Sequence, residues 1–404
     1  MRILFICWDG PQLTYLESLF LPIFERLGQH GYQFDILQFS WGDKPGEERV
    51  RAACARAGIG FRRVETWRRP RPLGPFLTAF AGGRQIERAV RAFGSELLMP
   101  RSIMAGLATL RARRRVRLPI LYDADGLAAD ERVDFAGLSP TSATYRLMRA
   151  IETRITRAAS AVITRSDFAS AVLAERAGPS VSADRFRRVA NGRDPVQFNP
   201  HGADQRAAAR AELGIAGDAP LIVYAGSVGG QYETRRIAIL MRAVRQLRPD
   251  ARLLVLSGDP DSAKALVLDA APEIAPASRF MSATPTEVPR LLAAADLGIA
   301  FRTPSFSMRA VSPIKTAEYL LCGVPVLGTA AIGDTQAARE AGVFFDESLG
   351  EAAAALWLIE QILPKRDDFR QRARQIGVDH FSLDRSVADY RAALELVVRD
   401  ADKP

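Results

Sequence analysis

Ser312-Pro-Ile-Lys-Thr-Ala-Glu-Tyr-Leu-Leu-Cys-Gly-Val-Pro-Val-Leu-Gly328 is the stretch of the 404-residue sequence that decides the fold. Pro313, near its start, suits the first turn of a helix, and Gly323 suits the position just after the last turn. The apolar run at 324–327 that follows predicts a buried strand. The stretch therefore predicts a loop, a short helix and a strand, which together form the repeating unit of an α/β fold.

The start of this helix predicts a binding site for an anion. The first N–H groups of a helix lack partners within the helix, and the helix dipole adds about half a positive charge there. We therefore expect a pyrophosphate group near Ser312, Pro313 and Ile314, with Lys315 neutralising its charge. Glu318, one turn further on, would accept hydrogen bonds from the hydroxyls of a ribose. An alternative stays open, because a Lys and a Glu three residues apart commonly form a surface ion pair worth about 0.2–0.5 kcal/mol.

Short apolar runs alternate with amphipathic stretches along the whole chain. The chain opens with a strand-like run at 3–7, helical spacing of Leu and Phe up to Gly28, and a second strand-like run at 34–39. Further strands are expected at 120–123, 161–164, 221–224, 253–256, 297–300 and 324–327. This alternation predicts parallel sheets covered by helices on both faces. The length suits two domains of about 200 residues each.

Composition narrows the class of protein. The hydrophobic content of 48% and the charged content of 25% are typical of a globular protein. No segment reaches the roughly 18 uncharged apolar residues that a membrane helix needs, and the N-terminal sequence is charged too early for a signal peptide. Cys7, Cys54 and Cys322 have no metal-binding spacing. We therefore expect reduced thiols and a cytoplasmic protein.

The net charge of +9 permits anionic partners. Two groups of arginines stand out, and we name them the first and second arginine clusters. The first contains Arg62, Arg63, Arg68, Arg69 and Arg71 around Trp67, and the second contains Arg111, Arg113, Arg114, Arg115 and Arg117. Such clusters can hold a protein on an anionic membrane surface at about 1 kcal/mol per charge. The alternative is that arginine is only the solubilising residue of this chain. Nucleic acid is not expected, because no recognition module accompanies the charge.

The turn-rich segment at 191–200 predicts a junction between two domains. It resembles the Asn-Gly-x-Asp-x-x-x-Phe-x-Pro signature of family 4 glycosyltransferases, and the stretch around Glu318 resembles the donor-site segment of the same family. The matching positions in the junction are Asn191, Gly192, Asp194, Phe198 and Pro200. The resemblance implies the GT-B fold, in which two Rossmann-like domains face each other across a cleft. It implies an N-terminal acceptor-side domain at 1–195, a donor domain at 196–380, and a helix at 381–404 that packs back on the first domain.

Two further segments resemble donor-site parts of the family. The loop at 225–230 contains Gly226, Ser227 and Gly229, whose backbone amides would approach the diphosphate. Ser227 departs from the family, which has an Arg there. Arg235 stands where the family has a Lys, and the resemblance implies that it helps to neutralise the diphosphate. The alternative is that Arg235 and Arg236 only solubilise the start of a helix.

Two other positions bear on how the donor is held. Phe280 and Met281 lie in a segment that resembles the family's loop over the nucleobase. The family also carries a first acid eight residues before the ribose-binding one, and that position is Ala310 here. We therefore expect sugar contacts in this loop to come from backbone amides and Ser312.

The N-terminal domain contributes residues after its strands. Gly10 follows the first strand and would face the donor diphosphate. The segment at 123–126 resembles the family's loop that approaches the transferred sugar, which implies a catalytic role for Asp125 beside Lys315 and Arg235. The alternative is that Asp123 and Asp125 are ordinary capping acids. An Asp-x-Asp pair binds metal in GT-A enzymes, but those have no second Rossmann-like half, so no metal is expected.

The resemblance implies a retaining glycosyltransferase of the EC 2.4 class. It would move a hexosyl unit from a nucleoside diphosphate sugar to a hydroxyl of a sugar, lipid-linked or small-molecule acceptor, in cell-surface polysaccharide or glycolipid synthesis. No cofactor is expected, and the enzyme would lie in the cytoplasm, peripherally on the anionic inner face of the membrane. Two alternatives stay open: a nucleotide-sugar epimerase on the same fold, and a non-catalytic subunit that binds nucleotide sugar or membrane.

Overall fold

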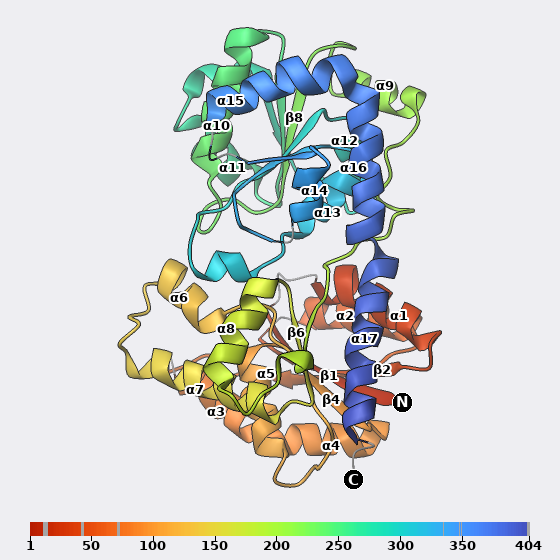
Figure 1. The fold of residues 1–404 in the computed structure, drawn as a ribbon, viewed down its shortest axis with the longest axis vertical. Helices are drawn as coiled ribbons and strands as arrows, with labels where there is room; N and C mark the ends of the chain where they lie inside the picture. The colour runs from red at the N-terminus through yellow and green to blue at the C-terminus, as the bar shows by residue number, and fades with distance from the viewer. Residues whose placement is uncertain are drawn as a thin grey trace. The chain divides into compact units, whose positions relative to one another are not determined.

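The chain folds into two compact units, which Figure 1 shows in a computed structural model. Unit 1 comprises Met1–Val189 and Ser386–Pro404, and unit 2 comprises Ala190–Arg385. The structure describes residues 1–10, 15–41, 44–70, 73–333, 335–346, 348 and 350–401. Each unit is built on a parallel sheet with the strand order of a doubly wound Rossmann-like domain. The predicted α/β class with two such domains is confirmed.

The sheet of unit 1 has the order β3-β2-β1-β4, and single bridges from β4 to β5 extend it to β5-β6-β7. Its strands are β1 (Arg2–Asp9), β2 (Gln33–Ser40), β3 (Gly60–Glu65), β4 (Leu97–Pro100), β5 (Leu121–Asp123), β6 (Ala161–Thr164) and β7 (Phe186–Arg188). Strand β1 is central, and the run from Ile3 to Ile6 is fully buried. An apolar run without alternation is what a strand needs when helices cover both faces of its sheet.

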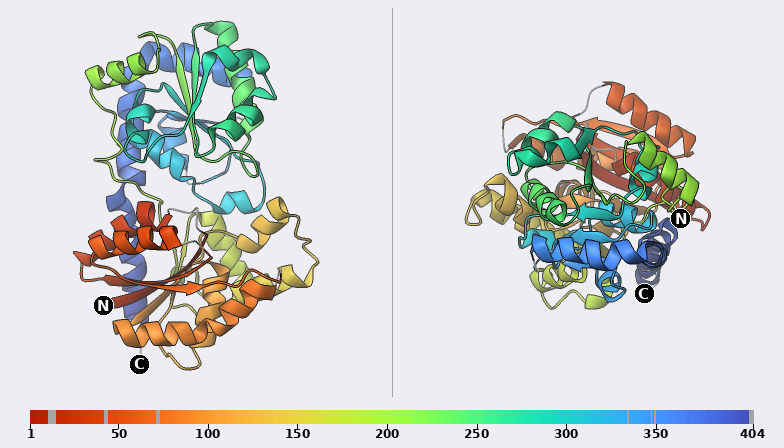
Figure 2. Two further views of the ribbon diagram at one scale, coloured as in Figure 1. Left: turned by 180° about the vertical axis from the view of Figure 1, so that it is seen from behind. Right: turned by 90° about the horizontal axis from the view of Figure 1, so that it is seen from above.

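Helices cover the sheet of unit 1 on both sides (Figures 1 and 2). They are α1 (Leu21–Gly28), α2 (Lys44–Arg56), α3 (Leu73–Ala81), α4 (Gly83–Phe93), α5 (Ser102–Ala112), α6 (Ala128–Ala136), α7 (Ala143–Ala158) and α8 (Asp167–Ala177), with the short turns η1 (Leu16–Phe20) and η2 (Ala183–Arg185). The last helix, α17 (Leu383–Ala401), belongs to unit 1 from Ser386 onward. It buries Tyr390, Leu394 and Val397 on one face. The predicted return of the terminal helix to the first domain is confirmed.

The sheet of unit 2 has the order β10-β9-β8-β11-β12-β13. Its strands are β8 (Leu221–Ala225), β9 (Arg252–Leu256), β10 (Ser278–Met281), β11 (Leu297–Ala300), β12 (Val326–Gly328) and β13 (Phe344–Asp346). The strand order reverses between β8 and β11. In open α/β sheets, ligands bind at this point, beyond the carboxyl ends of the strands.

The helices of unit 2 include the one predicted from the deciding stretch. They are α9 (Ala203–Glu212), α10 (Thr234–Leu247), α11 (Pro260–Leu268), α12 (Val288–Ala293), α13 (Ile314–Leu321), α14 (Gln336–Glu340), α15 (Glu351–Leu356) and α16 (Arg366–Phe381), with the short turns η3 (Pro272–Ala277), η4 (Ser307–Ala310), η6 (Trp357–Ile362) and η7 (Leu363–Lys365). Pro313 caps the start of α13, and Gly323, with a φ of 70°, ends it before β12. The predicted loop, helix and strand are confirmed.

The turn-rich segment at 191–200 begins unit 2. Contacts place the boundary at Val189 and Ala190, a few residues before the expected position. The segment is fixed within unit 2, because the Arg374 guanidinium donates hydrogen bonds to the carbonyls of Pro195 (2.9 Å) and Phe198 (2.7 Å). No helix in the described ranges is long and apolar enough to cross a membrane.

Candidate active site

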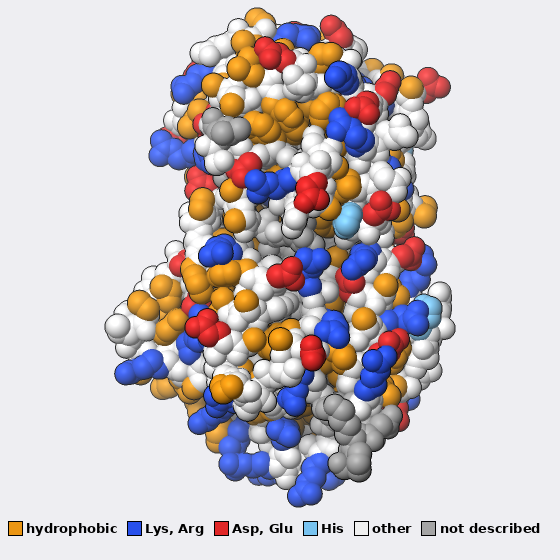
Figure 3. Space-filling model, in the orientation of Figure 1, with side chains coloured by type: hydrophobic (Ala, Val, Ile, Leu, Met, Phe, Trp, Pro, Cys, Tyr) orange, Lys and Arg blue, Asp and Glu red, His pale blue; other side chains and the backbone are white. Residues whose placement is uncertain are grey.

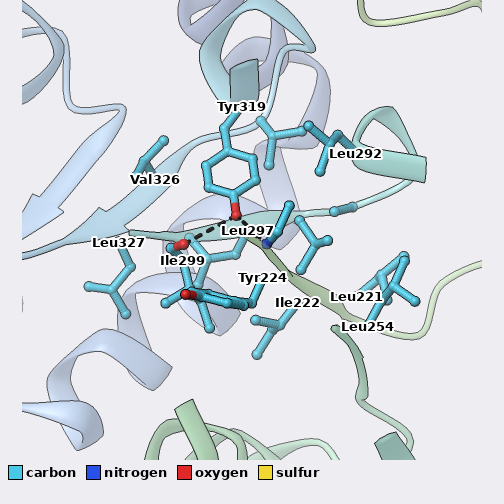
Figure 4. Close-up of a cluster of buried hydrophobic side chains, with 14 of the residues drawn as sticks. Leu221, Ile222, Tyr224, Leu254, Leu292, Leu297, Ile299, Tyr319, Val326 and Leu327 are labelled. Atoms are coloured by element: carbon cyan, nitrogen blue, oxygen red, sulfur yellow. Dashed lines mark hydrogen bonds between the residues drawn. The ribbon is translucent and has the colours of Figure 1, made fainter. Parts of the chain in front are cut away.

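Tyr319 holds α13 against the sheet where the strand order of unit 2 reverses (Figure 4). Its buried hydroxyl accepts the N–H of Ala225 in β8 (2.8 Å) and donates to the carbonyl of Ile299 in β11 (3.2 Å). The ring lies on Gly298, where an added Cβ would come within 2.6 Å of ring atoms. The start of α13 is thereby set at the carboxyl ends of β8 and β11. Sequence analysis did not select Tyr319, because its two partners are distant in the sequence.

The side chain of Lys315 places a buried amine between the start of α13 and the carboxyl end of β8. Its Nζ lies 4.0 Å from the ring centre of Tyr224 and 4.7 Å from that of Tyr232. A Cβ on Gly226 would lie 3.1 Å from Nζ, so this glycine leaves room for the amine. Among the described residues, Nζ has no hydrogen-bond partner. The surface ion pair that the sequence left open is therefore not what this side chain forms.

The electrostatics around Lys315 disfavour its charge in the absence of ligand. Burial lowers the pKa of Lys315 well below its usual value, and the charge of Arg302 lowers it further, whereas Glu318 acts in the opposite direction. A bound anion would reverse this balance, because an opposite charge in contact stabilises the protonated amine. The site around Lys315 can therefore take up an anionic group together with a proton.

The backbone N–H groups at the start of α13 also lack hydrogen-bond acceptors in the described structure. In the described structure, the amides of Ser312, Ile314 and Lys315 donate no hydrogen bond, as expected for the first turn of a helix. The side chain of Asn191 donates to the carbonyl of Ser312 at 2.8 Å and ties the junction segment to this turn. These amides and Lys315 lie together at the start of α13, and binding of a pyrophosphate there stays a prediction.

Glu318 lies one turn into α13 and is paired with Arg193. The Nε of Arg193 lies 3.0 Å from Oε1 of Glu318, and its guanidinium stacks 4.8 Å from the ring centre of Phe198. Burial raises the pKa of Glu318, and the charges of Arg193 and Lys315 oppose that rise. A second residue missed by sequence reasoning is therefore Arg193, which occupies the variable position of the junction signature. Its charge favours the ionised form of Glu318, against the effect of burial.

In the loop after β8, three glycines adopt positive φ angles. Gly226, Gly229 and Gly230 have φ values of 137°, 73° and 60°, which side chains rarely adopt. The amide of Gly226 donates to the carbonyl of Leu256 (2.9 Å) and is not available to a ligand. The amide of Ser227 has no hydrogen bond within the described ranges, while its carbonyl accepts the hydroxyl of Tyr224.

The side chain of Arg235 makes no contact with Lys315 in the described structure. Its side chain is 72% exposed on the first turn of α10 and lies 3.9 Å from Asp269. The basic side chain beside Lys315 is Arg302, which follows β11 and stacks 4.9 Å from the ring centre of Tyr232. The diphosphate contact expected of Arg235 stays a prediction, and Arg302 is the arginine that the geometry places beside Lys315.

Phe280 and Met281 do not lie in a loop, so that part of the expectation is wrong. They end β10, where residues 278–281 pair in parallel with β9. A polar edge strand of four residues lacks the long apolar run that would have revealed it. Ala310, at the position of the family's first acid, is fully buried in η4. The missing acid has no replacement at that position.

The corresponding end of the unit 1 sheet carries a charged network. Arg101 lies 3.2 Å from Asp123 and 2.5 Å from Asp125, and Arg165 lies 2.7 Å from Asp123. Burial opposes the charge on Arg101, but Asp125 and Asp123 raise its pKa above the usual value. Burial raises the pKa of Asp9, and Arg101 opposes that rise. Asp123 is therefore a buried structural anchor, whereas Asp125, 42% exposed with a φ of 61°, is the carboxylate presented to solvent.

A cavity of about 520 Å³ opens beyond the ends of β1 to β4 in unit 1, and its volume is within the range of sites that bind small organic molecules. It is mainly aromatic and apolar, with two arginines. Its lining includes Trp8, Trp41, Phe76, Met104, Met148, Arg68 and Arg132. Gly10 lies against Trp41, since a Cβ there would come within 2.8 Å of the indole ring. Gly10 thus shapes this cavity, and its expected contact with the donor diphosphate stays a prediction.

Comparison with known families identifies both halves of the chain. Residues 19–192 match the family described as "Glycosyl transferase 4-like domain", and residues 219–361 match "Glycosyl transferases group 1". Together these segments cover well over half of the chain. The chain belongs to the family 4 and group 1 glycosyltransferases. It is a nucleotide-sugar glycosyltransferase of the EC 2.4 class with the GT-B fold.

Solved structures of similar fold include three proteins that align over nearly the whole chain. HepE from Anabaena, in complex with UDP and glucose, has a TM-score of 0.70 and 17% identity over 98% of this chain and 99% of its own. Sucrose-phosphate synthase from Thermosynechococcus elongatus has a TM-score of 0.69 and 17% identity over 100% of both chains. WaaG, a glycosyltransferase involved in lipopolysaccharide biosynthesis, has a TM-score of 0.68 and 18% identity over 97% and 99%. At these identities the likeness concerns the fold. No curated protein sequence matches the chain significantly.

Proposed function

We propose that this glycosyltransferase moves a hexosyl unit from a nucleoside diphosphate sugar to an acceptor hydroxyl, with retention at the anomeric carbon. The observation that carries the proposal is the buried amine of Lys315, which lacks a hydrogen-bonded anion beside the open amides of α13. A diphosphate supplies that anion. Because HepE was crystallised with UDP and glucose, we propose UDP-glucose as the first donor to test.

The proposed mechanism rests on stabilising the leaving group. As the bond between the anomeric carbon and the donor oxygen breaks, its electron pair passes to the diphosphate. The amides of Ser312, Ile314 and Lys315 and the ammonium of Lys315 stabilise that growing negative charge, and preorganised groups of this kind give large rate effects. Glu318 accepts hydrogen bonds from the ribose and so fixes the diphosphate at the helix start. Asp125 is proposed to face the transferred sugar.

The acceptor is proposed to bind in unit 1, in the cavity lined by Trp8, Trp41 and Phe76. Its aromatic walls suit a sugar ring or an apolar group, and Arg68 and Arg132 suit a phosphate. This chemistry favours a role in cell-surface polysaccharide or glycolipid synthesis. The free, buried cysteines at 7, 54 and 322 accord with the cytoplasm as the place of action.

A panel of nucleoside diphosphates and their sugars tests the proposal. A ligand that binds only the folded state raises the melting temperature, so the correct donor and its diphosphate should each do so. The same donors are then assayed for release of nucleoside diphosphate, and NMR of the product reports the anomeric configuration. Lys315→Ala should abolish the shift with the diphosphate.

The outcomes separate the alternatives. An epimerase would change the donor sugar without releasing nucleoside diphosphate. A non-catalytic subunit, which the buried Ala310 makes a real competitor, would bind the donor without any turnover. If no nucleoside diphosphate shifted the melting temperature, the donor site itself would be wrong.

A further inference from the structure

An exposed apolar surface in unit 1 has no role in the function proposed above. Of the twelve large hydrophobic side chains exposed in the described chain, four lie between Trp67 and Phe80. Trp67 is 63% exposed, and Leu73, Leu77 and Phe80 of α3 are 58%, 52% and 54% exposed. The last three are spaced by four and three residues, so they share one face of the helix. We name these four residues the α3 stripe.

The exposure of the α3 stripe belongs to a well-anchored helix. The hydroxyl of Thr78 accepts the N–H of Trp67 (3.0 Å) and donates to the carbonyl of Gly74 (3.1 Å). Gly74 packs so closely that a Cβ would lie 2.8 Å from the carbonyl oxygen of Trp67. Gly74, Thr78 and Ala79 form the buried face of α3. Phe76, which is partly buried beside the exposed face, lines the cavity proposed for the acceptor. One face of the helix is thus packed, and the other presents apolar side chains to solvent.

Arginines lie at both ends of the α3 stripe. The Arg111 guanidinium lies 3.7 Å from the ring centre of Phe80, which puts the second arginine cluster beside the end of α3. Arg113 and Arg114 of that cluster are exposed and line a shallow hollow with Arg117. At the other end, Arg68 and Arg69 are exposed next to Trp67. Arg71, the last member of the first cluster, lies outside the described residues.

Figures 2 and 3 show where these helices and the basic end of unit 1 lie. Figure 2 (left) shows α3 and α4, in orange, along the outside of unit 1. Figure 3 shows basic side chains gathering at the end of unit 1 where Figure 1 draws these helices. Within the clusters, Arg115 pairs with Glu87 at 3.7 Å and Arg63 with Glu47 at 2.6 Å, so part of the charge is neutralised locally. Among the described residues, no acidic partner neutralises the charges of the arginines nearest the stripe, which are Arg68, Arg69, Arg111, Arg113 and Arg114.

We propose that the α3 stripe docks the enzyme on an anionic lipid bilayer. Apolar side chains on one face with arginines around them are the pattern of helices that lie in the membrane interface. Trp67, Leu73, Leu77 and Phe80 enter the boundary between headgroups and acyl chains, and the arginines contact lipid phosphates. A second copy of the chain fits this surface poorly, because it would bring the same arginines against one another. If the cavity lined by Phe76 holds the acceptor, as the proposed function requires, that acceptor reaches it from the membrane surface.

Co-sedimentation of the full chain with vesicles tests the docking. Vesicles of phosphatidylcholine alone are compared with vesicles that contain phosphatidylglycerol, at low and high salt. The parent should bind only the anionic vesicles and less at high salt. Leu77→Ser with Phe80→Ser should weaken binding by about tenfold or more, because two apolar side chains no longer leave water. Arg113→Gln with Arg114→Gln should weaken it by about fivefold for each charge removed.

Leu266→Ser is the matched control, because Leu266 is exposed at 39% in α11 of unit 2 and should leave binding unchanged. Release of nucleoside diphosphate from soluble donor should be equal in the parent and all variants, which separates docking from the donor site. A parent that stays in the supernatant with every vesicle overturns the proposal. So does equal binding by the Leu77/Phe80 variant, or a parent dimer that becomes monomeric in that variant, which would make the stripe an interface between copies.

Discussion

The surroundings of Lys315 give the strongest indication of a ligand-binding site. It is 9% exposed, its amine has no hydrogen-bonded partner in the described chain, and it lies beside open helix amides. Lys315→Ala should therefore weaken binding of the nucleoside diphosphate far more than binding of the nucleoside. Titration calorimetry with the two ligands measures the difference. Arg235→Ala was expected from the sequence to behave alike, but a side chain that is 72% exposed should give the smaller loss. Equal losses for both ligands in Lys315→Ala would show that the amine does not contact phosphate.

The pH dependence of diphosphate binding should report the same amine. Burial lowers the pKa of Lys315 in the free enzyme, and a bound diphosphate raises it. Between these two pKa values, binding takes up a proton, so affinity should fall as pH rises through that window. Calorimetry in two buffers of different ionisation enthalpy measures the proton uptake. Lys315→Met should remove it, and an unchanged uptake in that variant would assign the proton to another group.

Glu318 should contribute through its charge. Glu318→Gln keeps the size of the side chain but replaces a charged acceptor with a neutral one, which should weaken donor binding by about 1.5–3 kcal/mol. Arg193, 3.0 Å away, loses its partner in the same variant, so the free energy of unfolding is measured as well. Arg193→Gln is the control for that loss. Donor affinity equal to that of the parent would remove Glu318 from the ribose site.

At the scale of elements, the position of α13 depends on one hydroxyl. Tyr319 joins β8 to β11 through hydrogen bonds of 2.8 Å and 3.2 Å. Tyr319→Phe leaves the buried N–H of Ala225 without that partner, which should lower the free energy of unfolding by about 1–3 kcal/mol. Because the bond also sets the start of α13, affinity for the nucleoside diphosphate should fall with it. Urea unfolding and calorimetry measure the two effects, and lost stability with unchanged affinity would make Tyr319 purely structural.

The elements also show what the sequence could predict. Central strands such as β1 and β8 are buried on both faces, so their apolar runs were readable. Edge strands were not: β3 is partly exposed along most of its length and reads Gly-Phe-Arg-Arg-Val-Glu, and β10 was expected as a loop. These edge strands form because they pair with a neighbouring strand, and their own sequences contain no apolar run that predicts a strand. Contacts such as those of Arg193 with Glu318 join distant parts of the chain, and no local pattern announces them.

At the scale of the whole molecule, the alternation of apolar runs and amphipathic stretches along the chain predicted two α/β domains. Both sheets reverse their strand order once, at β1 and β4 in unit 1 and at β8 and β11 in unit 2. The candidate donor residues follow the second reversal, and Gly10 and the acceptor-side cavity follow the first. The sequence predicted that Gly10 and the loop at 225–230 follow strands, because each comes after an apolar run, but it did not predict the cavity. It could not predict the arginine network at Asp123, because those partners come from three strand ends.

The terminal helix gives the last prediction, which concerns the chain as a whole. Helix α17 begins at Leu383 and packs into unit 1 through Tyr390, Leu394 and Val397, and the hydroxyl of Tyr390 accepts from Arg165 at 3.2 Å. Leu394→Ala should lower the stability of unit 1 by about 2–5 kcal/mol, because a fully buried leucine leaves a cavity.

The tryptophans allow the two units to be followed separately. Trp8, Trp41 and Trp67 lie in unit 1, and Trp357 lies in unit 2. With Trp357→Phe as the background, fluorescence reports unit 1 alone, and its urea midpoint should fall in Leu394→Ala but not in Arg399→Ala, whose side chain is exposed on the same helix. Binding of nucleoside diphosphate, which we propose for unit 2, should be unchanged. A midpoint equal to that of the parent would mean that α17 contributes nothing to the stability of the first unit, even though its apolar face is buried there.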